Sequence, residues 1–112
     1  MRWRITPQLQ NKIGPAVLLA AAAIGAPAAS SQREDELKQL VRQDCGSCHG
    51  MTLKGGLGKP LLPETLAPLD VQSTAQIILG GIPGTPMPPW QGILSENDAL
   101  WIATKLKEGF PQ

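Results

Sequence analysis

The pattern of apolar and polar positions predicts three helices, over about residues 31–45, 71–79 and 95–108. Within each stretch, apolar residues recur three or four positions apart and so share one helix face. The intervening segments, 46–69 and 80–94, are rich in glycine and proline, which favour irregular loops. No stretch reads clearly as a strand. The pattern therefore predicts an all-α domain of three to four short helices joined by long loops.

Capping signals set the expected helix boundaries. Residues 31–34 (Ser-Gln-Arg-Glu) and 95–98 (Ser-Glu-Asn-Asp) are capping boxes, which satisfy the free backbone donors at a helix N-terminus. Asp70 is the expected N-cap of the middle helix, and Gly109 the expected end of the last. A further short helical turn is expected at 64–67.

The first 28 residues have the pattern of a secretory signal peptide. Three basic residues and no acidic one accompany an apolar run at 13–26, and residues 26–28 (Ala-Pro-Ala) offer the small side chains that signal peptidase prefers. The run is shorter than the roughly 20 residues that a membrane-spanning helix needs. We expect cleavage after Ala28 and a mature domain of residues 29–112 without a membrane span; an uncleaved membrane anchor is the alternative.

Composition and charge exclude several classes of function. A chain of 112 residues holds one domain at most, which rules out a multidomain enzyme, a coiled coil and a polytopic membrane protein. The net charge of +1 becomes −2 once the predicted signal peptide and its three bases are removed. No basic stripe remains, so nucleic acid is not an expected partner. With 4% aromatic residues, 12 glycines and 11 prolines, the chain has few bulky side chains for a hydrophobic core. Such a domain needs further stabilisation, for example by a bound cofactor or a covalent cross-link.

The motif Cys45-Gly46-Ser47-Cys48-His49 indicates what this stabilising group is. It is a CxxCH sequence, which marks the attachment of c-type haem. Two thiols bond to the porphyrin as thioethers, and the histidine that follows reaches the iron. A thioredoxin-like pair would need alternating strands and helices, and a zinc site needs four ligands where the chain has two cysteines and one histidine. A plain disulfide would leave His49 unexplained. We expect one haem c, attached through Cys45 and Cys48 and ligated by His49.

The second iron ligand is expected to be Met87. Haem iron in an electron carrier is held by histidine together with methionine or a second histidine, and the chain has no second histidine. Met1 leaves with the signal peptide, and Met51 lies too close to His49 to reach the opposite face of the haem. Met87 lies in a loop that three prolines stiffen. Its alternative role is that of a buried gap-filler.

The order of these features resembles that of the class I c-type cytochromes: a first helix that runs into CxxCH, a glycine-proline loop, a proline-rich loop with methionine, and a last helix with an aromatic residue. The segments 44–58 and 84–90 are similar to the NirC-type cytochromes. These are small periplasmic monohaem proteins encoded with the haem-cd nitrite reductase of denitrifying bacteria. Related haem-d-handling cytochromes of the same pathway share the signature. The resemblance implies a class I cytochrome c fold, a monomer and a periplasmic location.

The resemblance also implies roles for Pro60 and Trp90. Pro60 lies close to where the family places a backbone carbonyl that accepts the N–H of the proximal histidine, and Lys59 or Leu61 could supply that carbonyl instead. Trp90 is a candidate donor to a haem propionate through its indole N–H. Its alternative role is that of a lid over the haem edge.

The expected function is electron transport in denitrification, with haem-cd nitrite reductase as the acceptor, and not catalysis. An iron with both axial positions filled passes one electron and binds little else. The resemblance leaves open a second role, as an assembly factor or redox partner in the synthesis of haem d or its insertion into the reductase. A sensing or catalytic haem with a labile methionine is the third alternative.

Overall fold

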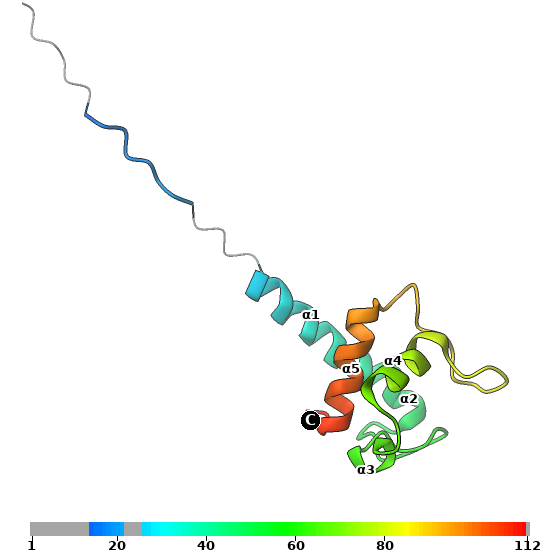
Figure 1. Ribbon diagram of the computed structural model, residues 1–112. Coiled ribbons are helices and arrows are strands. Elements are labelled where there is room, and N and C mark those ends of the chain that lie inside the picture. The colour runs from blue at the N-terminus through cyan, green and yellow to red at the C-terminus, as the bar shows by residue number, and fades with distance from the viewer. Residues whose placement is uncertain (1–13, 22–25, 112) are drawn as a thin grey trace, which may run out of the picture.

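The computed structural model describes residues 14–21 and 26–111 (Figure 1). Residues 14–21 have no regular secondary structure and are exposed. The predicted signal peptide falls largely on residues outside the described ranges, so it stays a prediction. No helix in these ranges is long and apolar enough to cross a membrane.

The described residues fold into helices and loops, and their only β-type pairing is an isolated bridge between Gln91 and Leu94. This confirms the all-α prediction. In chain order the elements are α1 (Ala26–Leu40), the π-helical turn η1 (Val41–Cys45), α2 (Gly46–His49), α3 (Pro63–Leu66), α4 (Val71–Gly80) and α5 (Glu96–Glu108).

The first helix differs from its prediction at both ends. It begins at Ala26, so Ser31 lies inside α1 and the capping box predicted there is wrong. The preceding residues are mostly alanine, the strongest helix former, and Pro27 falls in the first turn, where proline is tolerated. At its other end the helix continues through the motif, because the Gly46 N–H bonds to the carbonyl of Val41 five residues back. The CxxCH residues are therefore helical, although the loop was expected to begin at Gly46.

The two later helices have the caps that were predicted for them. The Asp70 carboxylate accepts a hydrogen bond of 2.6 Å from the Ser73 N–H at the start of α4. Ser95 and Asp98 form a reciprocal capping box at the start of α5, with two bonds of 3.0 Å each. Helix α5 ends at Glu108 as expected, and α3 lies one residue earlier than predicted. Local capping rules therefore determine these boundaries.

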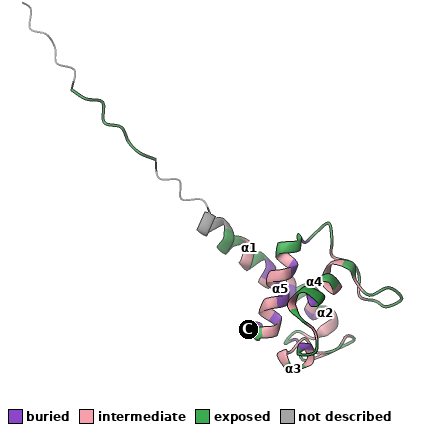
Figure 2. Cartoon of the chain, viewed as in Figure 1, coloured by how far each residue is buried: buried purple, intermediate pink, exposed green. Residues whose placement is uncertain are grey.

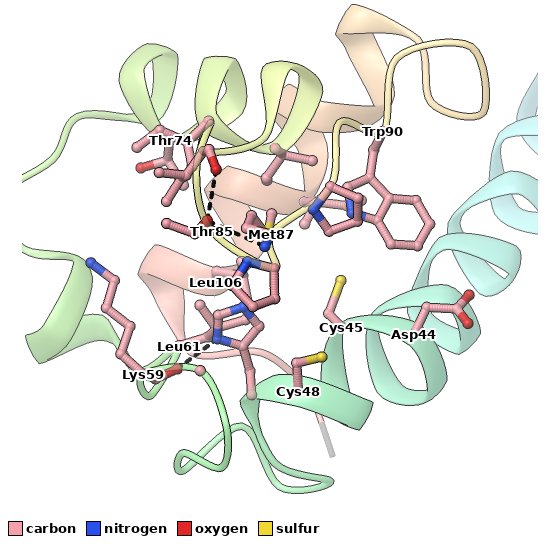
Figure 3. A pocket seen from close by; sticks show the side chains of 18 of the residues that line it. Asp44, Cys45, Cys48, Lys59, Leu61, Thr74, Thr85, Met87, Trp90 and Leu106 are labelled. Carbon is pink, nitrogen blue, oxygen red and sulfur yellow. Dashed lines mark hydrogen bonds between the residues drawn. The ribbon is translucent and has the colours of Figure 1, made fainter.

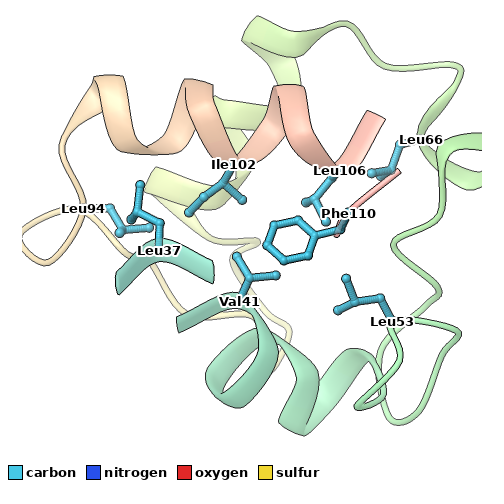
Figure 4. Packing of buried hydrophobic residues seen from close by; sticks show 8 residues of the cluster. All are labelled: Leu37, Val41, Leu53, Leu66, Leu94, Ile102, Leu106 and Phe110. Carbon is cyan, nitrogen blue, oxygen red and sulfur yellow. The ribbon is translucent and has the colours of Figure 1, made fainter. Parts of the chain in front are cut away.

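The core lies where α1 and η1 cross α5 (Figures 2 and 4). Leu37 and Val41 contribute to one side of it and Ile102 and Leu106 to the other, all 3% exposed or less. Phe110, just beyond α5, closes the cluster. Burial of this kind stabilises a fold by about 25 cal/mol per Å² of apolar surface. The crossing fixes η1, and with it the motif, relative to α5.

A second cluster holds α4 against α5. Ala75 from α4 packs on Ala99 and Ala103 from α5, and all three are 1% exposed or less. Small side chains let the two helices approach closely. The loop that follows α4 is therefore carried to the side of the molecule that faces α2.

Candidate functional site

A cavity of about 430 Å³ opens between α2 and the loop of residues 82–90 (Figure 3). Side chains from α4, α5 and the loop of residues 57–61 complete its walls. Most of the residues that line the cavity are apolar, including Leu61, Leu66, Ile78, Leu94, Ile102 and Leu106. A cavity with apolar walls and a few sulfur and nitrogen atoms suits a flat, hydrophobic cofactor better than a polar substrate.

The helical motif presents its chemistry to this cavity. Cys45, Cys48 and His49 all line it, and Figure 3 shows both sulfur atoms directed into the space between α2 and the facing loop. Neither cysteine is in a disulfide. Burial, with a smaller contribution from Asp44, raises the pKa of the Cys45 thiol to about 11. Because neither sulfur is in a disulfide, both are available for covalent attachment.

A backbone carbonyl fixes the imidazole of His49. Its Nδ1 lies 2.6 Å from the carbonyl oxygen of Lys59. In the neutral imidazole, an N–H on Nδ1 that donates to this oxygen leaves the lone pair of Nε2 free for a metal. The expectation for Pro60 is corrected by one residue, to an alternative stated above. The physical reason is that proline restricts the residue before it to extended conformations, which orients the Lys59 carbonyl.

Gly58 was not singled out from the sequence, yet it packs directly on the histidine. A Cβ added there would lie 2.9 Å from both Cε1 and Nδ1 of His49, closer than real Cβ contacts occur. The Gly58 N–H also donates to the carbonyl of Cys48 at 2.7 Å. The glycine density of this loop was the available signal, because a backbone that approaches a ring so closely has no room for a side chain.

Met87 lies on the loop that faces α2, and it lines the same cavity as His49. The Thr85 hydroxyl ties this loop together, because it donates to the carbonyl of Ile82 at 2.7 Å and accepts from the Met87 N–H at 3.3 Å. Met51 is 67% exposed and does not line the cavity. The structure therefore brings Met87, and not Met51, to the cavity that the motif lines.

Trp90 also lines the cavity, on the side where Cys45 and Asp44 lie (Figure 3). Its backbone N–H donates to the carbonyls of Ile78 and Leu79 at 3.2 and 3.1 Å. These bonds anchor the loop of residues 82–90, which carries Met87, to the end of α4. The position is compatible with both roles considered for Trp90, the propionate donor and the lid.

Comparisons with known proteins agree with this site. Over residues 32–104 the chain matches the family described as "Cytochrome C oxidase, cbb3-type, subunit III". It is 52% identical over 90 residues to cytochrome c55X of Paracoccus denitrificans, which covers 80% of this chain and 86% of that protein. The solved structure of the "c-type cytochrome NirC" has a TM-score of 0.70 at 49% identity, over 71% of this chain and 94% of that one.

A longer protein contains a similar domain. "Dihydro-heme d1 dehydrogenase NirN in complex with DHE" has a TM-score of 0.61 at 36% identity, over 67% of this chain and 16% of that one. The comparisons and the cavity support the same cofactor. The apolar walls, the two free thiols and the constrained imidazole fit one haem c, bonded through Cys45 and Cys48.

Proposed function

The chain belongs to the c-type cytochrome family, with the small c55X and NirC proteins among its relatives, and from this premise we propose that it donates single electrons to haem-cd nitrite reductase. The observation that carries the proposal is the pairing of side chains at one cavity. His49, the last residue of α2, and Met87, on the facing loop, both line it.

In this proposal His49 and Met87 would hold the haem iron between them. The haem supplies one-electron chemistry when it is bound. Because both side chains would be committed to the iron, no ligand position would remain for a substrate, and the proposed role is that of a carrier and not an enzyme. A thioether ligand and an apolar surround would both favour the reduced state and so raise the reduction potential of the haem.

The chain's own residues hold this ligand set in place. The Lys59 carbonyl fixes the ring of His49, and Gly58 packs against the same ring. Thr85 and the prolines of the facing loop restrict the backbone of Met87 at low entropic cost. Trp90 lies at the cavity wall, where its indole N–H is the proposed donor to a propionate. A rigid site needs little reorganisation when its charge changes, which favours rapid electron transfer.

The periplasm is the proposed location. Residues 1–28 are the proposed signal peptide and residues 29–112 the mature cytochrome domain. Covalent haem attachment to CxxCH and a single-domain chain without a basic stripe are compatible with an exported redox protein that works as a monomer.

Stopped-flow mixing tests the proposal. The reduced cytochrome is mixed with purified haem-cd nitrite reductase, and the absorbance of haem c is followed with and without nitrite. Rapid oxidation that nitrite sustains supports the donor role. Absence of electron transfer contradicts it. Carbon monoxide added to the reduced protein is the companion test, because rapid binding would show that Met87 does not hold the sixth position.

A second function is favoured by one comparison. A domain similar to this chain forms 16% of a longer protein described as a dihydro-heme d1 dehydrogenase. A free-standing copy could accept electrons in the synthesis of the same haem or assist its insertion into the reductase. The haem d1 content of reductase from cells with and without this chain separates the two functions. A reductase that is fully loaded without the chain contradicts the assembly role.

A further inference from the structure

Leu53 has a backbone conformation that is unfavourable for leucine. Its φ is 61°, and within the described part of the chain no other residue except glycine has a positive φ. This region suits glycine, which has no Cβ to clash with the backbone. The six other positions of this kind in that part all carry glycine. A leucine here indicates that its side chain provides a stabilisation that offsets the strain.

The side chain of Leu53 provides that stabilisation by packing in the core. It is 2% exposed and belongs to the same cluster as Val41 and Phe110. Figure 4 shows Leu53 and Leu37 at opposite ends of this cluster. Leu53 does not line the cavity. The loop of residues 50–61 is therefore anchored in the core, and not in the cofactor site, at Leu53.

The backbone of Leu53 joins this anchor to the carbonyl that holds His49. The Leu53 carbonyl accepts a hydrogen bond of 2.9 Å from the N–H of Leu61. Only Pro60 separates that N–H from the Lys59 carbonyl, and the proline ring fixes one of the two backbone angles between them. A fixed Leu61 N–H therefore restricts the direction of the Lys59 carbonyl, which lies 2.6 Å from Nδ1 of His49.

A second backbone bond holds the loop on the other side of Lys59. The Gly58 N–H donates to the carbonyl of Cys48 at 2.7 Å. This bond fixes the loop to the motif itself, whereas Leu53 fixes it to the core that α1 and α5 form. Lys59 lies between the two attachments, so the position of its carbonyl depends on both.

We propose that Leu53 is a positioning residue for the haem ligand His49. Burial of the Leu53 side chain holds the loop in a strained path, and the bond to Leu61 transmits this constraint to the Lys59 carbonyl. The imidazole is then oriented, and made more basic, by a hydrogen bond that rarely opens. The inference rests on the proposed function only in taking His49 as an iron ligand, and it does not depend on which protein accepts the electron.

Truncation of two matched leucines tests this role. Leu53→Ala is compared with Leu37→Ala, because both leucines are 2% exposed, belong to one core cluster and lie outside the cavity lining. Leu37 is part of α1 and not of the loop. Urea unfolding is expected to show losses of stability of similar size for the two variants. A merely structural role for Leu53 predicts that their effects on the haem site are equal as well.

Two measurements on the haem-loaded protein separate positioning from stability. By NMR of the reduced protein, exchange of the His49 Nδ1–H with solvent should be roughly tenfold faster in Leu53→Ala and within about twofold of wild type in Leu37→Ala. The reduction potential should rise only in Leu53→Ala. A looser hydrogen bond, without displacement of the ring, leaves the imidazole less basic and so stabilises ferric iron less.

Glycine substitutions at the same two positions test the strain. Leu53→Gly removes the anchor but relieves the positive φ, so it should be no less stable than Leu53→Ala. Leu37→Gly should be less stable than Leu37→Ala, since glycine weakens a helix. A Leu53→Gly variant that is less stable than Leu53→Ala would overturn the claim that the loop is strained there.

A measurement on the wild-type protein decides the question even where a variant does not fold. At low urea concentrations, exchange of the Leu61 N–H and of the His49 Nδ1–H should accelerate with the same slope, because one opening of the loop exposes both. Different slopes would overturn the inference, as would equal effects of Leu53→Ala and Leu37→Ala on exchange and potential. None of these readouts uses the reductase. Failure of electron transfer to the reductase would therefore contradict the proposed function and leave these results standing.

Discussion

The Nδ1 atom of His49 lies 2.6 Å from the carbonyl oxygen of Lys59, ten residues further along the chain. Between them the loop folds back on the motif, with the Gly55 N–H bonded to the carbonyl of His49 and the Gly58 N–H to that of Cys48. The orientation of the imidazole therefore depends on this loop as much as on α2. Hydrogen bonds of this kind make a ligating histidine more basic and fix its ring.

Gly58→Ala tests the role of this loop. Its Cβ would lie 2.9 Å from the ring of His49, so the ring or the loop must shift. Overpacking of this size costs about 1–3 kcal/mol of stability. We expect a lower reduction potential or a weaker low-spin signal by electron paramagnetic resonance.

Gly80→Ala is the control for this variant, because a Cβ at the end of α4 meets nothing within 4 Å. A spectrum unchanged from wild type and a stability equal to it or slightly higher are expected, because alanine is the better helix former. Equal behaviour of the two variants would show that contact with the ring is unimportant.

Met87→Ala is expected to leave the haem covalently attached but to open the sixth coordination position. The red-region band that arises from sulfur bound to ferric iron should disappear, and the potential should fall on the order of 0.1 V or more. Absorbance and potentiometric titration measure the two effects. Met51→Ala is the matched control, because Met51 is 67% exposed and outside the cavity. Persistence of the band in Met87→Ala would identify another ligand.

The double variant Cys45→Ala with Cys48→Ala is expected to be exported without haem and without a stable fold. The apolar walls of a cavity of about 430 Å³ would then lack the group that fills them. Intact-protein mass spectrometry checks the missing haem, and circular dichroism checks the helices. A helical, cooperatively unfolding apoprotein would show that the cores around Val41 and Ala99 are sufficient alone.

The ion pair between Arg33 and Asp98 predicts how stability varies with pH. It joins α1 to α5 at 2.6 Å, and together with bonds from Ser95 it lowers the pKa of Asp98 to about 2 from 3.8. A carboxyl group with a lowered pKa stabilises the fold above its unfolded pKa, and this stabilisation is lost as pH falls through the folded value. Asp98 therefore loses its contribution between about pH 4 and pH 2.

Asp98→Asn should lower the free energy of unfolding by about 1–2 kcal/mol at pH 7, a range reduced for the exposure of Arg33 to solvent. Its penalty should shrink as the pH approaches 2. Urea unfolding at pH 7 and pH 3 measures both effects. The control is Asp35→Asn, because Asp35 is 72% exposed in its 3.5 Å pair with Lys38 and should contribute less than about 0.5 kcal/mol. Equal losses in the two variants would contradict the prediction.

N-terminal sequencing of the exported protein tests the signal peptide. Cleavage after Ala28 gives a chain that begins at Ala29. Intact mass provides the same answer for protein with haem attached. Membrane-bound material that retains residues 13–26 would support the uncleaved anchor instead.

The chemistry of the site could be predicted because it depends on short-range spacing. Cys45, Cys48 and His49 lie within about one helical turn and a half, so their side chains meet whatever the rest of the chain does. Asp70 and Ser95 each act on a backbone N–H three residues away, and the caps predicted for them are present. The prediction at Ser31 was wrong because the alanines before it extend α1 toward the N-terminus.

Other features depend on the path of loops and on packing between distant segments. Leu53 is 2% exposed and has a φ of 61° in a loop that its sequence marks only as irregular. Such a backbone conformation persists because the surrounding packing holds it there. The loop's glycines permit many paths, so spacing alone left Lys59, Pro60 and Leu61 all open as the partner of His49.

The sequence by itself determined the CxxCH motif, the caps of α4 and α5 and the absence of charge from residues 71–95, because each follows from residue type over a short span. Only the tertiary structure decided that Lys59 holds the imidazole, that Gly58 packs on it, and that part of the uncharged stretch lies at the cavity mouth. The first two depend on the loop that folds back on the motif through the backbone bonds of Gly55 and Gly58, and the third depends on the packing of α4 on α5. The packing of the helices is stabilised by burial of apolar surface. No local sequence pattern specifies which distant segments bury that surface together.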